Sequence, residues 1–263
     1  MRSLVRGRVL AATGRQVGPP QGRTLSRGRD ILQPGDPLLF AGAGLAGYWI
    51  DDVDVALNGT TVSAWGDQSG NDYDLSQGVA GAQPLFVAGE LNGHNYLRFD
   101  GSNDGLMKSG VDMFAGGAYS WVAVVRIVST VAFKVGFGNA GTVSGGMYYA
   151  IHSAAGAHRV THAGAFDATD GISTTAWSVI TICRAAAAAP TLEINGVSAA
   201  LAGTTTTLNA AVGANIHLGF HTTATFPQPM ECAFLAALTI GYSAGQRLAA
   251  TRWAGNRYGI DVA

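Results

Sequence analysis

The stretch Trp65-Gly66-Asp67-Gln68-Ser69-Gly70-Asn71 and its counterpart Arg98-Phe99-Asp100-Gly101-Ser102-Asn103-Asp104 carry the strongest fold signal in this chain. Each follows apolar, strand-like residues and closes them with Asp, Ser, Asn and Gly. These four residue types fold the local backbone into Asx-type turns or accept a positive φ angle, so the chain must reverse tightly at both places. The two turn blocks therefore predict strands joined by short turns.

Strand-like segments continue on both sides of the turn blocks. They are short and separated by Gly, Asn, Ser and Thr, a spacing that favours a β-sandwich. Asn195-Gly196 is in addition a strong signal for a hairpin. The predicted strands are Leu45–Ile50, Pro84–Val87, Tyr96–Phe99, Tyr119–Val128, Ala132–Phe137, Met147–His152, His158–Ala163, Trp177–Arg184, Thr191–Ile194, Asn215–Phe220 and Glu231–Tyr242.

A helix is predicted near the C-terminus. Ser243 can cap its first turn while Gln246, three residues later, reaches back to the capping residue. Apolar residues such as Trp253 follow at helical spacing, and Gly255 or Gly259 can end the helix. We expect this helix to pack on the edge of the sandwich.

The composition suits one large β-domain. The chain has 263 residues, of which 48% are hydrophobic and only 13% charged, and this excludes a polar disordered chain. No apolar run is long enough to span a bilayer, and arginines interrupt the N-terminus where a signal peptide needs an apolar core. We therefore expect synthesis in the cytoplasm without a signal peptide, and no membrane contact.

Charge divides the chain into a basic arm and an acidic body. The remaining nine basic residues and all seventeen acidic residues follow the arm's arginines, which gives the rest of the chain a formal charge of −8. Residues 1–44 show no helical or strand period and contain Gly18-Pro19-Pro20, so they are predicted to be extended and to become ordered only against a partner. Basic tails can bind nucleic acid, an acidic protein surface or neighbouring copies. The arginines of the arm are Arg2, Arg6, Arg8, Arg15, Arg23, Arg27 and Arg29.

Several further segments of the sequence follow one another in an order that can be compared with that of known protein families. They are Tyr48-Trp49-Ile50-Asp51, Val62 through Asn71, Gln83-Pro84, Leu91-Asn92-Gly93, Leu97 through Asp104, Leu192 through Val197, and Tyr242-Ser243 through Ile260. In this combination residues 45–263 resemble the concanavalin A-like, laminin-G-like jelly-roll domains. The resemblance implies an all-β fold, a two-sheet antiparallel jelly-roll sandwich with one C-terminal α-helix, here preceded by the extended N-terminal arm.

The resemblance also implies a class of function. Domains of this type are frequent in bacteriophage virion proteins, in bacterial surface proteins and in sugar-binding modules, although fold alone does not settle function. We therefore expect a phage virion structural or attachment protein, either a tail, a fibre or a head-decoration component. The arm would anchor it to other virion proteins rather than to nucleic acid, and self-association, as a trimer, is expected from how such proteins assemble.

The alternative function is a carbohydrate-binding module that recognises a glycan of the host surface. A flat aromatic ring can pack against a sugar ring, and Tyr73, Tyr148 and Tyr149 are the candidates for glycan contact. Four tryptophans have more apolar surroundings, which predicts core packing instead. They are Trp49, Trp65, Trp121 and Trp177.

Hydrolysis is not expected, because a glycosidase needs two suitably spaced carboxylates. The chain has only three glutamates, and Glu231 is followed by Cys232-Ala233-Phe234 rather than by a second acid at an alternating position. Glu193 lies between two apolar residues. The sequence therefore predicts that the chain is not an enzyme, although an unusual pair of aspartates stays open.

Neither a cofactor nor a metal is favoured. Asp67, Asn71 and Asp72 in the first turn block, and Asp100 and Asp104 in the second, offer the oxygen ligands that calcium takes, but the same residues close Asx turns without an ion. Gly42 through Gly47 fits the G-x-G-x-x-G pattern but leads into a strand-like segment, whereas a dinucleotide site needs a helix there. The two cysteines, Cys183 and Cys232, are expected to be buried free thiols.

Overall fold

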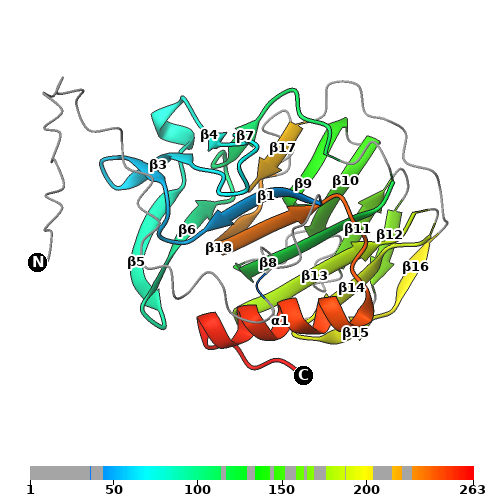
Figure 1. Ribbon diagram of the computed structural model, residues 1–263. Helices are drawn as coiled ribbons and strands as arrows, with labels where there is room; N and C mark the ends of the chain where they lie inside the picture. The colour runs from blue at the N-terminus through cyan, green and yellow to red at the C-terminus, as the bar shows by residue number, and fades with distance from the viewer. Residues whose placement is uncertain are drawn as a thin grey trace, which may run out of the picture.

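The computed structural model describes residues 36, 44–113, 117–128, 134–142, 145–151, 158–162, 165–168, 176–186, 188–203, 215–220 and 227–263. Within these residues the chain forms an antiparallel β-sandwich followed by one α-helix, as predicted (Figure 1). Most of the arm, including its seven arginines, lies outside the described residues. Asp36 is the exception: it is fully buried and accepts a hydrogen bond from the Tyr48 hydroxyl over 3.2 Å.

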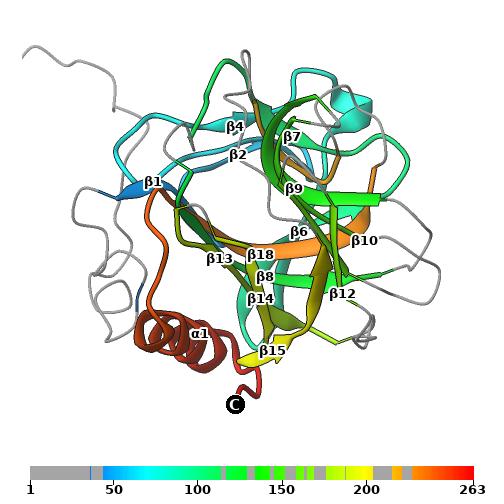
Figure 2. The same ribbon diagram turned by 90° about the vertical axis from the view of Figure 1, so that its right-hand side faces the viewer.

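The strands form two layers that curve around a common interior (Figure 2). One layer holds β5 (Leu85–Leu91), β6 (His94–Asp100), β1 (Leu45–Ile50), β18 (Pro229–Leu238), β8 (Tyr119–Ile127), β13 (Ser178–Arg184), β14 (Thr191–Ile194) and β15 (Val197–Ala199). The other holds β4 (Leu75–Ser76), β7 (Leu106–Lys108), β17 (Asn215–Leu218), β9 (Lys134–Thr142), β10 (Gly145–Ile151), β11 (His158–His162), β12 (Ala165–Ala168) and β16 (Leu201–Gly203). The hairpin of β2 (Val55–Asn58) and β3 (Thr61–Trp65) links the layers, since β3 pairs with both β4 and β5.

Strand β18 lies at the centre of the first layer. It pairs along one edge with β8 and along the other with β6 and then β1. The sequence of β18 is nearly continuously apolar because both faces of the strand are covered. One face packs against the second layer and the other against the helix. A bulge between Cys232 and Phe234 puts Ala233 and Phe234 on the same, helix-facing side.

The core between the two layers contains three of the four tryptophans predicted for it. Trp49, Trp65 and Trp121 are fully buried, and the Trp121 ring lies 5.5 Å from that of Phe137. Trp177 differs, since it is only partly buried and packs on the opposite, outer face of the first layer. Cys183 and Cys232 are buried free thiols, as expected.

Helix α1 (Ala244–Tyr258) covers part of that outer face (Figures 1 and 2). The predicted cap is confirmed: Ser243 and Gln246 form both halves of a capping box. Of the two candidate glycines, Gly259 ends the helix, with a φ angle of 66° in the left-handed region that favours glycine. Trp253 and Tyr258 bury their rings against Phe234 of β18.

The bounds of some strands differ from those predicted, because pairing with neighbouring strands sets where each strand begins and ends. β1 and β14 match to the residue, whereas β18 begins two residues earlier than predicted and ends at Leu238 instead of Tyr242. Short strands such as β2, β3 and β7 were not predicted, because three to five residues carry too little periodicity. No described helix has the length and apolar character needed to cross a bilayer.

Candidate functional site

The first turn block is closed by the carboxylate of Asp67. Its Oδ1 atom accepts the amides of Tyr48 and Ser69, each over 2.9 Å. Its Oδ2 atom accepts the Ser69 hydroxyl over 2.6 Å and the Tyr73 amide over 3.2 Å. The Asn71 side chain donates to two carbonyl groups of the β1 segment. The block thereby fixes the turn against β1.

The second turn block is built in the same way. Asp100 Oδ1 accepts the Ser102 amide over 2.7 Å, and Asp104 Oδ2 accepts the Asp100 amide over 3.0 Å. Gly101 has a φ angle of 76°, and a Cβ atom there would lie 2.5 Å from the Pro229 side chain. A residue without a side chain is therefore required where this turn meets β18.

The calcium candidates are thus engaged in their own turns. Burial raises the pKa of Asp104 to about 6, and the nearby Asp100 charge adds to this rise. Burial also acts on Asp100, but its backbone hydrogen bonds outweigh that effect and lower its pKa. Asp72 is exposed. Within the described ranges, no three side chains of His, Cys, Asp or Glu come together to hold a metal ion.

The expectation of glycan contact is corrected for two of the three tyrosines. Tyr148 and Tyr149 lie on β10, between β9 and β11, and both are buried. The Tyr149 ring stacks on Phe137, and its hydroxyl forms a hydrogen bond with His158. Tyr73 is partly buried against the core between the layers. The two buried rings offer no face to a ligand outside the protein.

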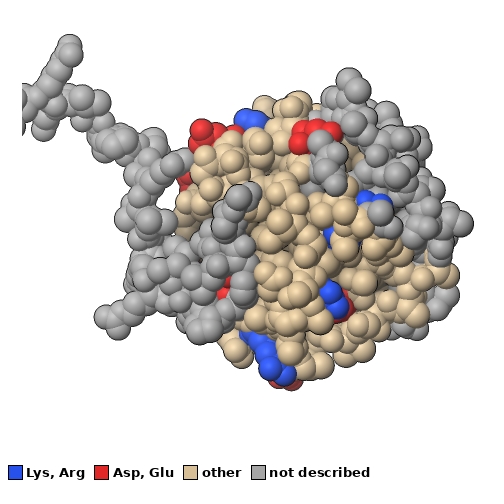
Figure 3. Space-filling view, turned by 45° about the vertical axis from the view of Figure 1, so that its right-hand side comes forward, with Lys and Arg blue, Asp and Glu red and all other residues tan. Residues whose placement is uncertain are grey.

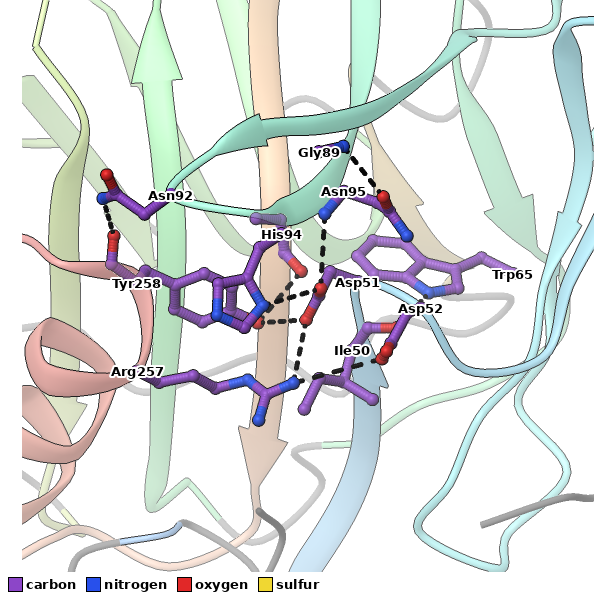
Figure 4. A network of polar contacts seen from close by, with 11 residues as sticks. Ile50, Asp51, Asp52, Trp65, Gly89, Asn92, His94, Asn95, Arg257 and Tyr258 are labelled. Carbon is purple, nitrogen blue, oxygen red and sulfur yellow. Dashed lines mark hydrogen bonds and ion pairs between the residues drawn. The ribbon is translucent and has the colours of Figure 1, made fainter. Parts of the chain in front are cut away.

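A polar network ties the end of β1 to the end of helix α1 (Figure 4). Buried Asp51 accepts hydrogen bonds from the Tyr258 hydroxyl over 2.8 Å and from Arg257 Nη2 over 3.2 Å. Its other carboxylate oxygen lies 3.1 Å from His94 Nδ1 and accepts the Asn95 amide over 3.4 Å. Burial alone would raise the pKa of Asp51, but the His94 hydrogen bond and the Arg257 charge outweigh it and lower the pKa.

This network explains why the helix stays docked. Besides Asp51, the Tyr258 hydroxyl also lies 3.3 Å from the Ala233 carbonyl of β18, and the Asn92 side chain donates to the Tyr258 carbonyl over 2.6 Å. Three separate parts of the chain therefore meet at the last turn of the helix. We interpret the network as the lock of the C-terminal helix and not as a binding site.

A second charged cluster lies on the same outer face, beyond the end of the helix. Arg98 of β6, Glu231 of β18 and Arg126 of β8 are direct cross-strand neighbours in register, and they form a row across three strands. Arg98 Nε donates to one Glu231 oxygen over 2.8 Å, and Arg126 Nε donates to the other over 2.5 Å. The Glu231 side chain is 2% exposed, while those of Arg98 and Arg126 are 41% and 33% exposed.

Two aromatic rings complete this cluster. Trp177 directly precedes β13 and lies beside Arg126, with the guanidinium carbon 5.6 Å from the ring centroid. The Tyr96 ring meets the Trp177 ring edge-on at 5.0 Å, and the Tyr96 hydroxyl accepts from Arg98 and donates to Glu90. We call Arg98, Glu231, Arg126, Tyr96 and Trp177 the outer row.

Some hydrogen-bond donors of the outer row have no acceptor among the described residues. Among the described residues, neither Arg98 Nη1 nor Arg126 Nη1 has a hydrogen-bond partner, and neither atom is buried. Figure 3 shows one face of the protein, on which charged side chains are few and most of the visible surface is uncharged. Fixed guanidinium groups beside an aromatic ring can bind oxygen-rich, ring-shaped ligands.

Comparison with known proteins bears on the fold. The sequence matches no protein-family model and no curated protein sequence. Among solved structures it is similar to the Trypanosoma rangeli sialidase in complex with sialic acid, with a TM-score of 0.58 and 17% identity over 82% of this chain and 33% of the sialidase. It is also similar to the binding domains of Paraclostridial Mosquitocidal Protein 1 (TM-score 0.54) and botulinum neurotoxin serotype D (TM-score 0.53). Each of these is 11% identical over 81% of this chain and 52% of the neighbour.

These similarities correct one prediction from the sequence. The chain was expected not to be an enzyme, yet the solved structures with its fold include sialidases, which are enzymes. The lack of an alternating carboxylate pair is therefore no sufficient ground for excluding catalysis. The chain spans a third of the sialidase and about half of each toxin binding domain, and at these identities the likeness concerns the fold. The phage context stays a prediction.

The outer row was not predicted from the sequence, although a signal for it exists. Arg98 and Arg126 each interrupt an apolar strand, as does Glu231. A charged residue inside an apolar strand calls for a partner on a neighbouring strand. The sequence does not say which strands are neighbours, so Glu231 was considered only as a single carboxylate and Trp177 only as a core residue.

Proposed function

We propose that this chain is the recognition module of an attachment protein and that its outer row binds carbohydrate. The observation that carries the proposal is the pair of partly exposed guanidinium groups, held in place by Glu231, beside the Trp177 ring. Guanidinium N–H groups donate to sugar oxygens, and an aromatic ring packs against the apolar face of a sugar. Three adjacent strands supply the charged groups and Trp177 directly precedes a fourth, so these groups are held close to the sheet.

The structural neighbours support this class of function. They include a sialidase in complex with sialic acid, which is a sugar, and two toxin binding domains. The complex of the sialidase with sialic acid supports sugar recognition as the class of function, whether or not turnover follows. Cleavage of the bound sugar is therefore tested separately, by experiment.

For the setting of the module we propose a phage virion, to which the basic arm joins the sandwich. Seven arginines without an acidic residue precede Asp30, and the rest of the chain carries the opposite net charge. Arginine forms strong, paired hydrogen bonds with carboxylates, so an acidic protein surface suits the arm. Neighbouring copies of this chain, whose bodies are acidic, would offer such a surface as well.

A glycan array tests the carbohydrate proposal. The full chain is compared with Trp177→Leu, which keeps an apolar side chain at the edge of the helix-facing cluster but removes the flat ring. We expect the full chain to bind a defined set of glycans and the variant to lose about tenfold or more in affinity, since stacking on the ring is lost. Leu57→Ala, at an exposed apolar position of β2 outside the outer row, is the control and should bind as the full chain does.

Two outcomes would contradict the proposal. One is a full chain that binds no glycan, and the other is a Trp177→Leu variant that binds as well as its parent. Thermal unfolding of both variants shows whether the fold has survived. Mass analysis of the bound glycans after incubation shows whether they are also cleaved.

A further inference from the structure

We propose that the sugar bound by the outer row carries a carboxylate. On the solvent side of the sheet, the Nη1 groups of Arg98 and Arg126 would donate hydrogen bonds to this carboxylate. This inference rests on the proposed carbohydrate-binding function and names the class of its ligand: acidic pyranosides, that is, sialic acids or uronic acids. The argument comes from the charges, the free donors and one weak ion pair of the cluster.

The charge balance of the outer row favours an anion. Two guanidinium groups share a single buried carboxylate, so the row by itself has one positive charge in excess. Glu231 is engaged by both Nε atoms and is only 2% exposed, so it orients the arginines from below and is not available to a ligand. What the cluster presents to solvent is therefore the donor side of the two arginines.

One acidic side chain of the protein already lies beside Arg98. Glu90 Oε2 lies 3.6 Å from Arg98 Nη2 and accepts the Tyr96 hydroxyl over 2.8 Å. Its side chain is 61% exposed, and ion pairs this exposed and this long contribute little. A ligand carboxylate can displace Glu90, and the Tyr96 hydroxyl would then donate to the ligand. Glu90 thus acts as a built-in competitor for the carboxylate.

Planar geometry favours a carboxylate over a sulfate. A guanidinium group offers two parallel N–H donors, which match the two oxygens of a carboxylate. The Arg126 guanidinium carbon lies over the Trp177 ring, 5.6 Å from its centroid, so a sugar whose carboxylate meets Arg126 would lie close to this ring. A lysine in place of Arg126 would keep the charge but lose the paired donors.

Titration calorimetry at low salt tests the inference. The full chain is titrated with the methyl glycosides of N-acetylneuraminic acid and of glucuronic acid, and with the methyl esters of both, which lack the negative charge. We expect the acids to bind about tenfold or more tightly than their esters, and Arg126→Lys to lose about tenfold for the acids, as expected for a charge-assisted, paired contact. The better of the two acids identifies the source of the carboxylate.

Glu90→Gln supplies the sharper test. Removing the competing charge should raise affinity for the acids by about two- to tenfold while affinity for the esters stays unchanged, because only the acids compete with Glu90. Arg252→Lys, an exposed position on helix α1, is the matched control for Arg126→Lys and should change neither.

The outcomes separate the two proposals. Equal binding of the acids and their methyl esters overturns the carboxylate inference. If neutral glycans bind and Trp177→Leu abolishes that binding, the carbohydrate function stands and the carboxylate inference falls. If no sugar binds at all, both fall. Unchanged acid binding by Glu90→Gln also counts against the inference.

Discussion

At the scale of single residues, Asp51 shows how one buried charge is stabilised. Its two oxygens together meet Tyr258, Arg257, His94 and the Asn95 amide, and its partner Arg257 is itself largely buried. Buried charges persist when they are paired and hydrogen-bonded in this way, and removing one partner leaves the other without compensation.

Replacing Asp51 by Asn should therefore lower the free energy of unfolding by about 3 kcal/mol, because Arg257 would keep its charge without a buried counter-ion. Urea denaturation at pH 7 measures the change. Asp52, next in sequence and exposed, lies 4.0 Å from Arg257, and Asp52→Asn should change the free energy by less than about 0.5 kcal/mol. Similar losses for the two variants would show that the Asp51 network does not lock the helix.

The same comparison has a defined pH dependence. The pKa of Asp51 is lowered in the folded protein, so folding favours its charged form, and the stability it contributes is complete above its ordinary pKa of 3.8. That contribution is lost as the pH falls through the lowered, folded-state pKa. The difference in unfolding free energy between the natural chain and Asp51→Asn should shrink as the pH falls below about pH 4.

Asp51 also marks a limit of sequence analysis. The segments Tyr48-Trp49-Ile50-Asp51 and Arg257-Tyr258-Gly259 both contribute to the resemblance to jelly-roll domains, but 206 residues separate Asp51 from Arg257. Neither segment alone indicates that the two meet. The outer row was missed for the same reason, because its members come from β6, β18 and β8 and from the residue before β13.

At the scale of elements, local signals made the helix predictable. The cap and the first turn involve only residues three apart, so Ser243 and Gln246 could be identified from the sequence. Strand pairing is not local, and the bulge at Cys232 and Phe234 decides which side chains of β18 face the helix. The prediction of β18 as a strand was correct, while the surroundings of Glu231 depended on that pairing.

Ser243→Ala should lower the stability of the protein by about 1 kcal/mol, because the backbone amide of Gln246 loses its side-chain acceptor. Gly245→Ala provides the opposite change in the same turn. A Cβ atom at Gly245 meets no neighbour within 4 Å, so alanine should raise stability by about 0.5 to 1 kcal/mol. Thermal unfolding of both variants measures the two shifts, and shifts of the same sign would contradict this account of the helix start.

At the scale of the whole molecule, the basic arm and the sandwich are predicted to have separate tasks. The arginines of the arm all precede Asp30, whereas Asp36, one of the described arm residues, accepts the Tyr48 hydroxyl with its carboxylate. A cut between these positions separates the two tasks experimentally.

Deleting residues 1–29 should leave the unfolding temperature unchanged within error but abolish incorporation into the parent assembly, because the positive charges of the anchor are gone. Deleting residues 1–43 also removes Asp36 and should in addition cost about 1 kcal/mol of stability, the usual worth of a hydrogen bond. Occupancy is measured by quantitative gel analysis of purified assemblies. Full occupancy of the first deletion would refute the anchoring role.

The central position of β18 has a consequence for synthesis on the ribosome. Strands β1, β6 and β8 are complete by residue 127, yet each needs residues 229–238 as its neighbour. At a translation rate of about 5–20 residues per second, about 5 to 20 seconds pass between the synthesis of these strands and that of β18. During this time one edge of each strand lacks its hydrogen-bonding partner, and such an unpaired edge can pair with another strand nearby. The nascent chain is therefore most exposed to mispairing while its second layer is being translated, and a cell that makes many copies at once has to bring several such chains close together during that interval.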